Sequence, residues 1–130
     1  MNNLNIKTLA ALGARVAFLG SGGYALPVRF RIRGGAVECR VPTWTGIGDL
    51  LEEPVDLLLV AVDDTGAHLR WLFLRGPAAV VQEPDWEGLE PNPVDRVSRE
   101  DLYQLIRLQP RRIEWVDEER GWGVRETLDL

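Results

Sequence analysis

Two strands joined by Gly34-Gly35 constrain the fold of this chain more than any other feature of its sequence. Apolar and charged residues alternate on both sides of these glycines, over residues 28–41. A two-residue turn fixes the register of a β-hairpin, because residues at equal distances from the turn pair with each other. The predicted pairs, outward from the turn, are Arg33 with Ala36, Ile32 with Val37, Arg31 with Glu38, Phe30 with Cys39, Arg29 with Arg40, and Val28 with Val41.

This register gives the hairpin one apolar face and one charged face. The apolar face includes Cys39, which we therefore interpret as a packed core thiol and not as a nucleophile. On the charged face Arg31 and Glu38 form a cross-strand ion pair, whereas Arg29 stands opposite Arg40. Such a like-charge pair costs about 0.2–1 kcal/mol unless an anion lies between the two side chains. The alternative is a solvated face on which the two arginines splay apart.

The loop after the hairpin strengthens the anion interpretation. It runs Pro42-Thr43-Trp44-Thr45-Gly46-Ile47-Gly48, which supplies two hydroxyl groups, an aromatic ring and two glycines at the start of a candidate helix. Backbone N–H groups at a helix start, the hydroxyls of Thr43 and Thr45, and two guanidinium groups can together bind a phosphate. The sequence therefore predicts a phosphate pocket formed by Arg29, Arg40, Thr43 and Thr45.

The remaining turn-forming residues predict an antiparallel β sandwich or barrel. Glycine- and aspartate-rich turns separate apolar stretches of strand length throughout the first two thirds of the chain. The predicted strands span residues 15–19, 24–33, 36–41, 55–62, 68–75, 78–82 and 111–116. Predicted helices are a weak one at the N-terminus, two turns over residues 46–53, and a helix that begins at Ser98 and carries Leu102, Leu105 and Ile106 on one face. Residues 83–97 form a surface connection and residues 117–130 a polar tail.

Composition limits the function classes. The chain has 130 residues, 45% of them hydrophobic, so we expect one domain over residues 1–130. Its net charge of −5 argues against a general nucleic-acid binder. One cysteine and one histidine argue against a zinc site, and no stretch resembles a membrane span or signal peptide, so we expect a cytoplasmic protein. Lys7 is the one lysine among 15 basic residues, so the positive charge is almost entirely arginine.

The order of these elements resembles that of the pyridoxamine 5'-phosphate oxidase-like, FMN-binding split β-barrels. The resemblance covers most of the chain. Its segments are Gly20-Ser21-Gly22-Gly23-Tyr24 after the first strand, Pro27-Val28-Arg29-Phe30 in the second, the threonine loop before Pro54, a hairpin from His68 to Val81, and the tail from Arg112 to Leu128. It implies a mainly β (α+β) fold, a six- to seven-stranded antiparallel split β-barrel with short peripheral helices.

The resemblance also implies a homodimer that binds FMN at the subunit interface and acts on a small-molecule substrate. Carried over by position, Arg29 or Arg31 is the basic residue of the second strand, Arg40, Thr43 and Thr45 lie at the phosphate loop, and Arg70, Trp71 and Trp44 border the flavin ring. The sequence departs from the family at Gly46-Ile47-Gly48-Asp49, where related loops usually carry Ser or Thr followed by Lys or Arg. An aspartate disfavours a nearby phosphate.

Two functions follow from these residues. The first is an FMN-dependent oxidoreductase, in which the cofactor carries the hydride chemistry and no protein acid or base is required. The second is a non-catalytic dimeric barrel that has lost its flavin, and the residues do not decide between FMN, a deazaflavin, haem and no cofactor. The strand over residues 55–62 is apolar on both faces apart from Asp56, which independently predicts a partner subunit. Trp122, between two glycines, is expected to dock over a bound ring system or onto the partner subunit.

Overall fold

The computed structural model describes residues 16–21, 23–49, 51, 53–62, 68–94 and 96–130. The predicted N-terminal helix lies outside these residues. One antiparallel sheet holds nine strands in the order β6-β7-β3-β2-β1-β4-β5-β8-β9. The strands are β1 (Val16–Ser21), β2 (Tyr24–Arg33), β3 (Ala36–Pro42), β4 (Val55–Val62), β5 (Leu69–Gly76), β6 (Ala78–Val80), β7 (Tyr103–Leu108), β8 (Arg112–Asp117) and β9 (Arg125–Asp129). The described helices are short: η1 (Thr43–Thr45), η2 (Ile47–Asp49), α2 (Arg99–Leu102) and η3 (Glu118–Arg120).

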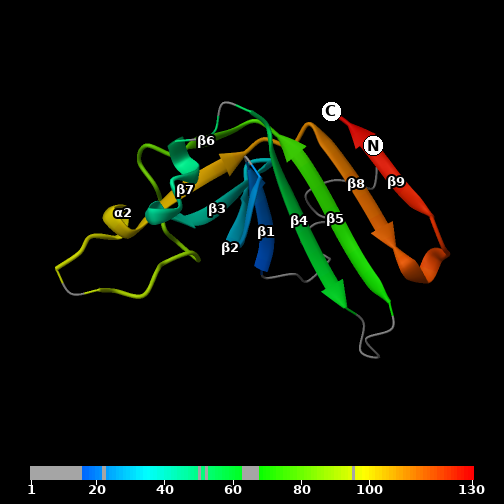
Figure 1. The fold of residues 1–130 in the computed structure, drawn as a ribbon, viewed down its shortest axis with the longest axis horizontal. Coiled ribbons are helices and arrows are strands. Elements are labelled where there is room, and N and C mark those ends of the chain that lie inside the picture. The colour runs from blue at the N-terminus through cyan, green and yellow to red at the C-terminus, as the bar shows by residue number, and fades with distance from the viewer. Residues whose placement is uncertain (1–15, 22, 50, 52, 63–67, 95) are drawn as a thin grey trace.

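Two long bent ribbons curl the sheet into a barrel. β5 continues into β6 across Pro77, and β7 continues into β8 across residues 109–111. β5 pairs with β8, β6 pairs with β7, and between them the Gln109 and Arg111 amides donate to the Pro77 and Arg75 carbonyls at 3.0 and 2.8 Å. Because β7 also pairs with β3 and β5 with β4, the circuit of paired strands is complete (Figure 1).

The predicted hairpin over residues 68–81 is therefore wrong. β5 and β6 do not pair with each other, although Gly76-Pro77 has the composition of a turn. Proline lacks the N–H that a hairpin ladder uses, and here it marks the bend at which the ribbon exchanges one partner strand for the next. Gly76 lies at the same bend, where the ribbon crosses its neighbour closely.

Glycine is required at position 76 by the closeness of this crossing. A Cβ atom placed on Gly76 collides with the backbone carbonyl of Gln109 and stands 3.1 Å from the Arg111 amide nitrogen. Both neighbours are main-chain atoms of a paired strand, so neither can rotate away. Gly20, on β1, makes a useful comparison because a Cβ there meets its nearest atoms at 3.8–3.9 Å.

We expect Gly76→Ala to lower the free energy of unfolding by about 1–3 kcal/mol, the usual cost of overpacking. Gly20→Ala, which adds the same methyl group to a strand where space is available, is the control and should change stability by less than half as much. Urea denaturation followed by circular dichroism measures both. Equal effects of the two substitutions would contradict a steric requirement at the crossing.

The predicted hairpin register is confirmed. β2 and β3 pair Arg29 with Arg40 and Arg31 with Glu38, as the glycine turn requires. The apolar face points into the barrel, where Val28, Val37, Cys39 and Val41 are buried and Phe30 and Ile32 pack against them. The main core is completed from the facing strands by Leu57, Leu59, Leu72, Leu74, Ile106 and Ile113.

The helix predicted from Ser98 is wrong beyond Leu102. Only Arg99–Leu102 is helical, and Tyr103–Leu108 is strand β7. Leu105 and Ile106 are both buried because they face opposite sides of the sheet: Ile106 enters the main core, whereas Leu105 packs under Trp86 and Leu89. A strand buried on both faces produces the same adjacent apolar pairs as a helix, which explains the error.

The strand count also differs from the six to seven predicted. All seven individual strands are present within two residues of their predicted ends, and β7 and β9 are added to them. β9 lies in the predicted polar tail, where Leu128 packs against the core while charged residues alternate with it. One 3-10 turn, η2, stands within residues 46–53, where a two-turn helix was predicted, and another, η1, directly precedes it.

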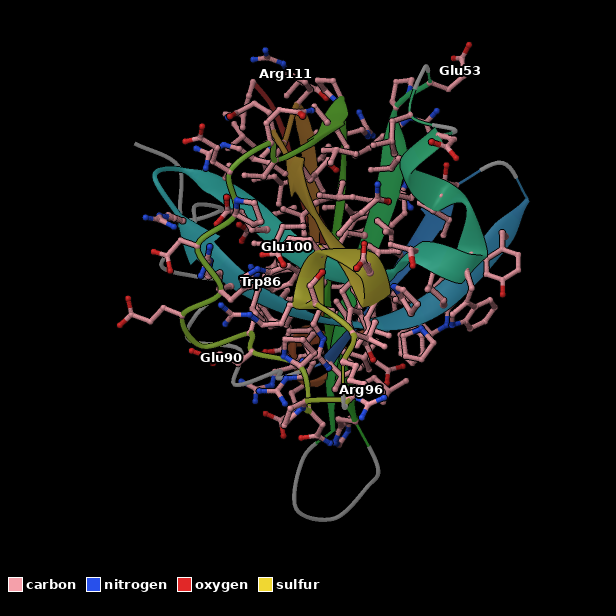
Figure 2. All side chains as sticks on the ribbon, turned by 90° about the vertical axis from the view of Figure 1, so that its left-hand side faces the viewer. Glu53, Trp86, Glu90, Arg96, Glu100 and Arg111 are labelled. Atoms are coloured by element: carbon pink, nitrogen blue, oxygen red, sulfur yellow. The ribbon has the colours of Figure 1, made fainter. Side chains whose placement is uncertain are left out.

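The connection over residues 81–93 covers the outer face of β7, β3 and β2, and we call it the strap. Trp86 and Leu89 are buried against Leu105, forming a second, smaller core outside the barrel. The Trp86 indole N–H donates to the Glu100 carboxylate at 3.2 Å. Figure 2 looks onto the strap, with α2 beside it. The surface connection predicted here is thus a docked cover for half of the sheet.

Candidate functional site

Arg29 and Arg40 lie side by side where the strap ends. They are a directly opposed pair across β2 and β3. Together with Tyr103 they line two adjoining hollows, one of about 220 Å³ and one of about 300 Å³. Val16 and Pro27 complete the first hollow. The second is completed from the strap side by Glu90, Asn92, Val94 and Leu102. The structure therefore brings two predicted phosphate ligands together at a concave surface.

Arg40 is held on two sides. Its guanidinium carbon lies 4.8 Å from the centre of the Tyr103 ring, a cation–π contact. Its Nη1 donates to the backbone carbonyls of Leu89 and Glu90 at 3.2 and 3.1 Å. The like-charge conflict predicted for this pair is thus partly relieved within the chain, because Arg40 points toward carbonyl dipoles. Within the described residues the Arg29 guanidinium has no hydrogen-bond or ion-pair partner.

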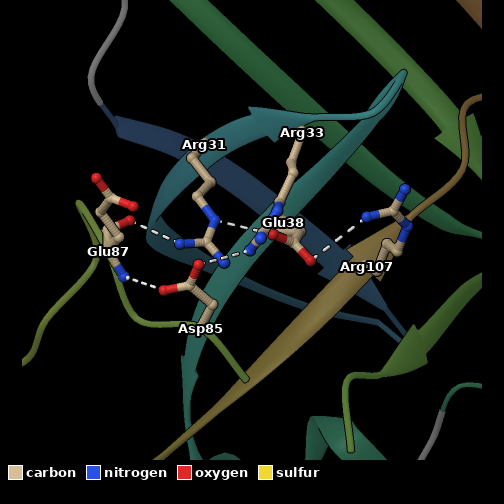
Figure 3. Close-up of polar contacts among 6 residues, drawn as sticks. All are labelled: Arg31, Arg33, Glu38, Asp85, Glu87 and Arg107. Atoms are coloured by element: carbon tan, nitrogen blue, oxygen red, sulfur yellow. Dashed lines mark hydrogen bonds and ion pairs between the residues drawn. The ribbon is translucent and has the colours of Figure 1, made fainter. Parts of the chain in front are cut away.

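Arg31 belongs to a different group of charges, under the strap. Its Nε donates to Glu38 at 2.8 Å, the ion pair predicted from the register, and its Nη1 donates to the Glu87 carbonyl at 2.6 Å. Glu38 is only 3% exposed and also faces Arg107 at 3.5 Å (Figure 3). Burial of a carboxylate between two guanidinium groups is tolerated because both of its oxygens are paired. Arg31 lines neither of the hollows that Arg29 and Arg40 share.

Charge pairs also fix the start of the strap. Asp85 faces Arg33 at 3.1 Å. The pKa of Asp85 is lowered, first by the Glu87 amide that donates to it and then by Arg33 and Arg31. Its contribution to strap docking is therefore present above the ordinary carboxyl pKa and is lost as the pH falls through the lowered value.

The threonine loop makes contacts within the chain. The Thr43 hydroxyl donates to the carbonyls of Asp101 and Leu102 at 2.8 and 3.1 Å. The Thr45 hydroxyl donates to the Pro42 carbonyl at 2.7 Å and accepts from the Ile47 amide at 3.3 Å. Trp44 between them is 78% exposed. None of these three residues lines the hollows of Arg29 and Arg40, so the loop and the arginines are not joined in one pocket.

Trp71 lines a third and larger hollow, of about 380 Å³, on the outer face of β5, β8 and β9. Val116 and Val124 give it an apolar wall, and His68, Glu114, Glu118 and Arg125 a polar rim. Trp122 also lines it and is fully exposed, so none of the described residues covers this ring. Arg70 does not line this hollow. It is the neighbour of Trp71 on β5, and the side chains of adjacent strand residues point to opposite faces of the sheet.

One row of residues across the sheet connects Arg29 with Trp71. Arg29 pairs with Val16 on β1, and Trp71 pairs with Val60 on β4. Extending the β1–β4 register by one residue places Val16 opposite Val60. Three strand spacings therefore separate Arg29 from Trp71, about 14 Å along the sheet. The floor between them is apolar, and Val16 is 44% exposed.

Sequence reasoning missed Tyr103 and the strap as parts of this site. Tyr103 was expected inside a helix, which hid its register position opposite Pro42 and beside Arg40. Residues 83–97, which include most of the strap, were expected only to form a surface connection. An alternating strand pattern from Tyr103 to Leu108 was the one available sign, and burial of both faces obscured it.

Cys39 is a buried core thiol, as the hairpin register predicted. Burial raises the pKa of Cys39 from 9.0 to about 12, with a smaller contribution from the Glu38 charge. Its thiol is therefore protonated and inaccessible at neutral pH. In the described part of the chain, no group of three or more His, Cys, Asp or Glu side chains could hold a metal ion.

We expect Cys39 in the folded protein to resist a thiol reagent at pH 8 and to react on unfolding in urea. Its raised pKa also destabilises the fold at high pH, because between pH 9.0 and about 12 the unfolded chain loses a proton that the folded chain retains. Cys39→Ala should accordingly lose less stability than the parent protein over this range. Labelling of native protein as fast as of unfolded protein would contradict the assignment.

Comparison with known proteins places the fold. No protein-family model and no curated protein matches the chain. Among solved structures, a heme-binding protein from Mycobacterium smegmatis is 20% identical with a TM-score of 0.68, over 95% of this chain and 55% of that one. This chain thus spans little more than half of that protein. An FAD-binding protein from the same organism is 13% identical with a TM-score of 0.65, covering 90% of this chain and 97% of that one.

A third structure carries the family name. It is a protein from Clostridium acetobutylicum related to general stress protein 26, of the pyridoxinephosphate oxidase family, 14% identical with a TM-score of 0.67 over 96% of this chain and 93% of that one. The chain has the split β-barrel fold of the pyridoxamine 5'-phosphate oxidase-like proteins. The resemblance drawn from the sequence is confirmed at the level of fold. No helix in the described split barrel is long and apolar enough to span a membrane.

Proposed function

We propose that this split barrel is a cytoplasmic homodimer that binds FMN and acts as an oxidoreductase on a small-molecule substrate. One observation carries the proposal: Arg29 and Arg40 are adjacent at a concave surface, on the same row of the sheet as the Trp71 hollow. Similar structures include FAD-binding and heme-binding proteins, which supports a cofactor of this kind.

The two arginines suit a phosphate. Arg29 has no partner among the described residues, and Arg40 uses only Nη1 for the strap carbonyls. Free N–H groups on two neighbouring guanidinium groups can donate to the oxygens of one phosphate and neutralise its charge. A bound anion between them would also remove what is left of the like-charge repulsion. The residues present therefore fit a flavin phosphate.

The homodimer is supported by the apolar outer face of β1, β4 and β5. Phe18 on β1 is 47% exposed, and it shares one row with Leu58 on β4 and Phe73 on β5. A two-fold axis parallel to the strands would place Arg29 of one copy over Trp71 of the other copy. A two-fold axis in the interface but perpendicular to the strands would instead place Arg29 of one copy over Arg29 of the other. We therefore propose that the phosphate binds at Arg29 and Arg40 and the ring at Trp71 of the second copy.

Chemistry in this proposal belongs to the flavin, which supplies hydride transfer when bound. The chain's own residues hold and orient it: guanidinium groups for the phosphate, an apolar floor and an aromatic hollow for the ring. Cys39, which is buried and protonated, supplies no nucleophile at this surface.

We expect the purified protein to bind FMN, and Arg29→Ala to weaken binding about tenfold or more through loss of a charged phosphate contact. Quenching of flavin fluorescence measures the dissociation constant. The matched control is Arg112→Ala, which removes an arginine that pairs with Asp129 on β9, away from the strap and outside the three hollows. Absence of any flavin binding, or haem bands in the absorption spectrum, would overturn the FMN assignment.

The dimer has its own test. Phe18→Asp places a charge on the apolar face and should convert the dimer to monomer in analytical ultracentrifugation, with loss of FMN binding. Leu130→Asp adds the same charge at an exposed leucine that lies after β9 and outside the hollows, and it should leave both unchanged. A parent protein that is monomeric at micromolar concentration would refute the arrangement.

The second candidate function is a non-catalytic dimeric barrel without flavin. It is favoured by the threonine loop, whose hydroxyls are bonded to backbone carbonyls, and by Asp49 in the following turn. In that case the purified dimer is colourless. Replacing both Arg29 and Arg40 by alanine then changes neither the assembly of the dimer nor the set of small molecules bound to it, which mass spectrometry measures.

A further inference from the structure

The strap contacts Arg40, one of the two proposed phosphate ligands. It is docked through Trp86 and Leu89, which are 4% and 2% exposed, on the outer side of Leu105. From that position its Leu89 and Glu90 carbonyls accept from Arg40 Nη1. The buried anchor and the arginine contact thus share one residue, Leu89, so movement of the anchor moves an acceptor of Arg40.

Tyr103 holds the other side of the same guanidinium. Its ring centre lies 4.8 Å from the Arg40 guanidinium carbon and its side chain packs against the strap core. Arg40 is therefore clamped between an aromatic face and two carbonyl groups. A long arginine side chain otherwise loses substantial rotamer entropy when it is fixed on a ligand. Here the clamp fixes Arg40 before any ligand arrives.

The strap also lines the hollow of about 300 Å³ that Arg29 and Arg40 share. Glu90, Asn92 and Val94 line the side opposite Arg29. Arg29, by contrast, has no clamp among the described residues. The hollow thus combines one fixed guanidinium with one adjustable guanidinium, and only the fixed one depends on the strap.

We propose that the strap and Tyr103 act as a positioning device that holds Arg40 for the phosphate, so that phosphate recognition is coupled to docking of the strap. The inference rests on the proposed function for the identity of the ligand and goes beyond it in naming Leu89 and Tyr103 as positioning residues. Coupling of this kind is reciprocal: if docking of the strap favours phosphate binding, phosphate binding favours docking of the strap.

The coupling between Arg40 and the strap is tested first without ligand. The Val81 and Leu89 amides donate to the Leu105 and Trp86 carbonyls at 2.8 Å, so their hydrogen exchange reports opening of the strap. Arg40→Ala removes a donor to two strap carbonyls and should speed exchange at both amides about fivefold. Arg29→Ala, the matched control on the neighbouring strand, should leave exchange unchanged.

The effect on the ligand is tested with FMN and riboflavin, which differ only in the phosphate. Leu89→Ala and Tyr103→Leu should each weaken FMN about tenfold and riboflavin less than twofold, since only the phosphate meets Arg40. Tyr103→Phe retains the aromatic face and should restore FMN affinity to within twofold of the parent. In the parent protein FMN, but not riboflavin, should slow exchange at Val81 and Leu89.

The outcomes separate this inference from the proposed function. If Arg40→Ala leaves strap exchange unchanged, the coupling is wrong whether or not FMN binds. If Leu89→Ala weakens FMN and riboflavin equally, the strap supports the fold in general and positions nothing. If the parent binds no FMN, the proposed function fails, and the exchange comparison alone decides whether the strap and Arg40 are coupled.

Discussion

The crossing of the two bent ribbons at Gly76 is the constraint on which the rest of the structure depends. There the Gly76 position approaches the Gln109 backbone too closely for any side chain. The crossing brings β7 beside β3, which places Tyr103 against Arg40 and Leu105 beneath the strap. It also leaves β4, β5 and β8 extending away from the crossing with an outer face that the described residues leave partly exposed. The surroundings of Arg40 and the exposed face beside Trp71 thus both follow from the close approach of the two ribbons at Gly76.

Local sequence patterns predicted most of the fold because they are set by neighbours in the chain. The Gly34-Gly35 turn determines its own register, and β2 and β4 begin and end where alternation and turns indicate. β7 was mistaken for a helix because it is buried on both faces. The barrel core covers one face, and the strap, about 20 residues earlier in the chain, covers the other. The pairing of β5 with β8 could not be predicted either, because it depends on the bend at Gly76-Pro77, which has the composition of a turn.

For the site, the sequence placed Arg29 and Arg40 together correctly but could not place their surroundings. The register brings two like charges side by side, and an external anion was the simplest compensation visible from the sequence. In the structure, backbone carbonyls of the strap and the Tyr103 ring compensate Arg40. Backbone carbonyls are present at every residue, so no side-chain pattern marks the ones that bind an arginine.

The arginine-rich composition acquires a physical meaning from Arg40. Its guanidinium lies against an aromatic ring, donates to two carbonyls through one nitrogen, and keeps other N–H groups for the hollow. A lysine ammonium is a compact point charge without a planar face, and it cannot stack and fork at once. Arg31 likewise binds a carboxylate and a carbonyl through different nitrogens. On this face of the barrel, arginine joins the strap to the hairpin while retaining positive charge at the surface where an anion is proposed to bind.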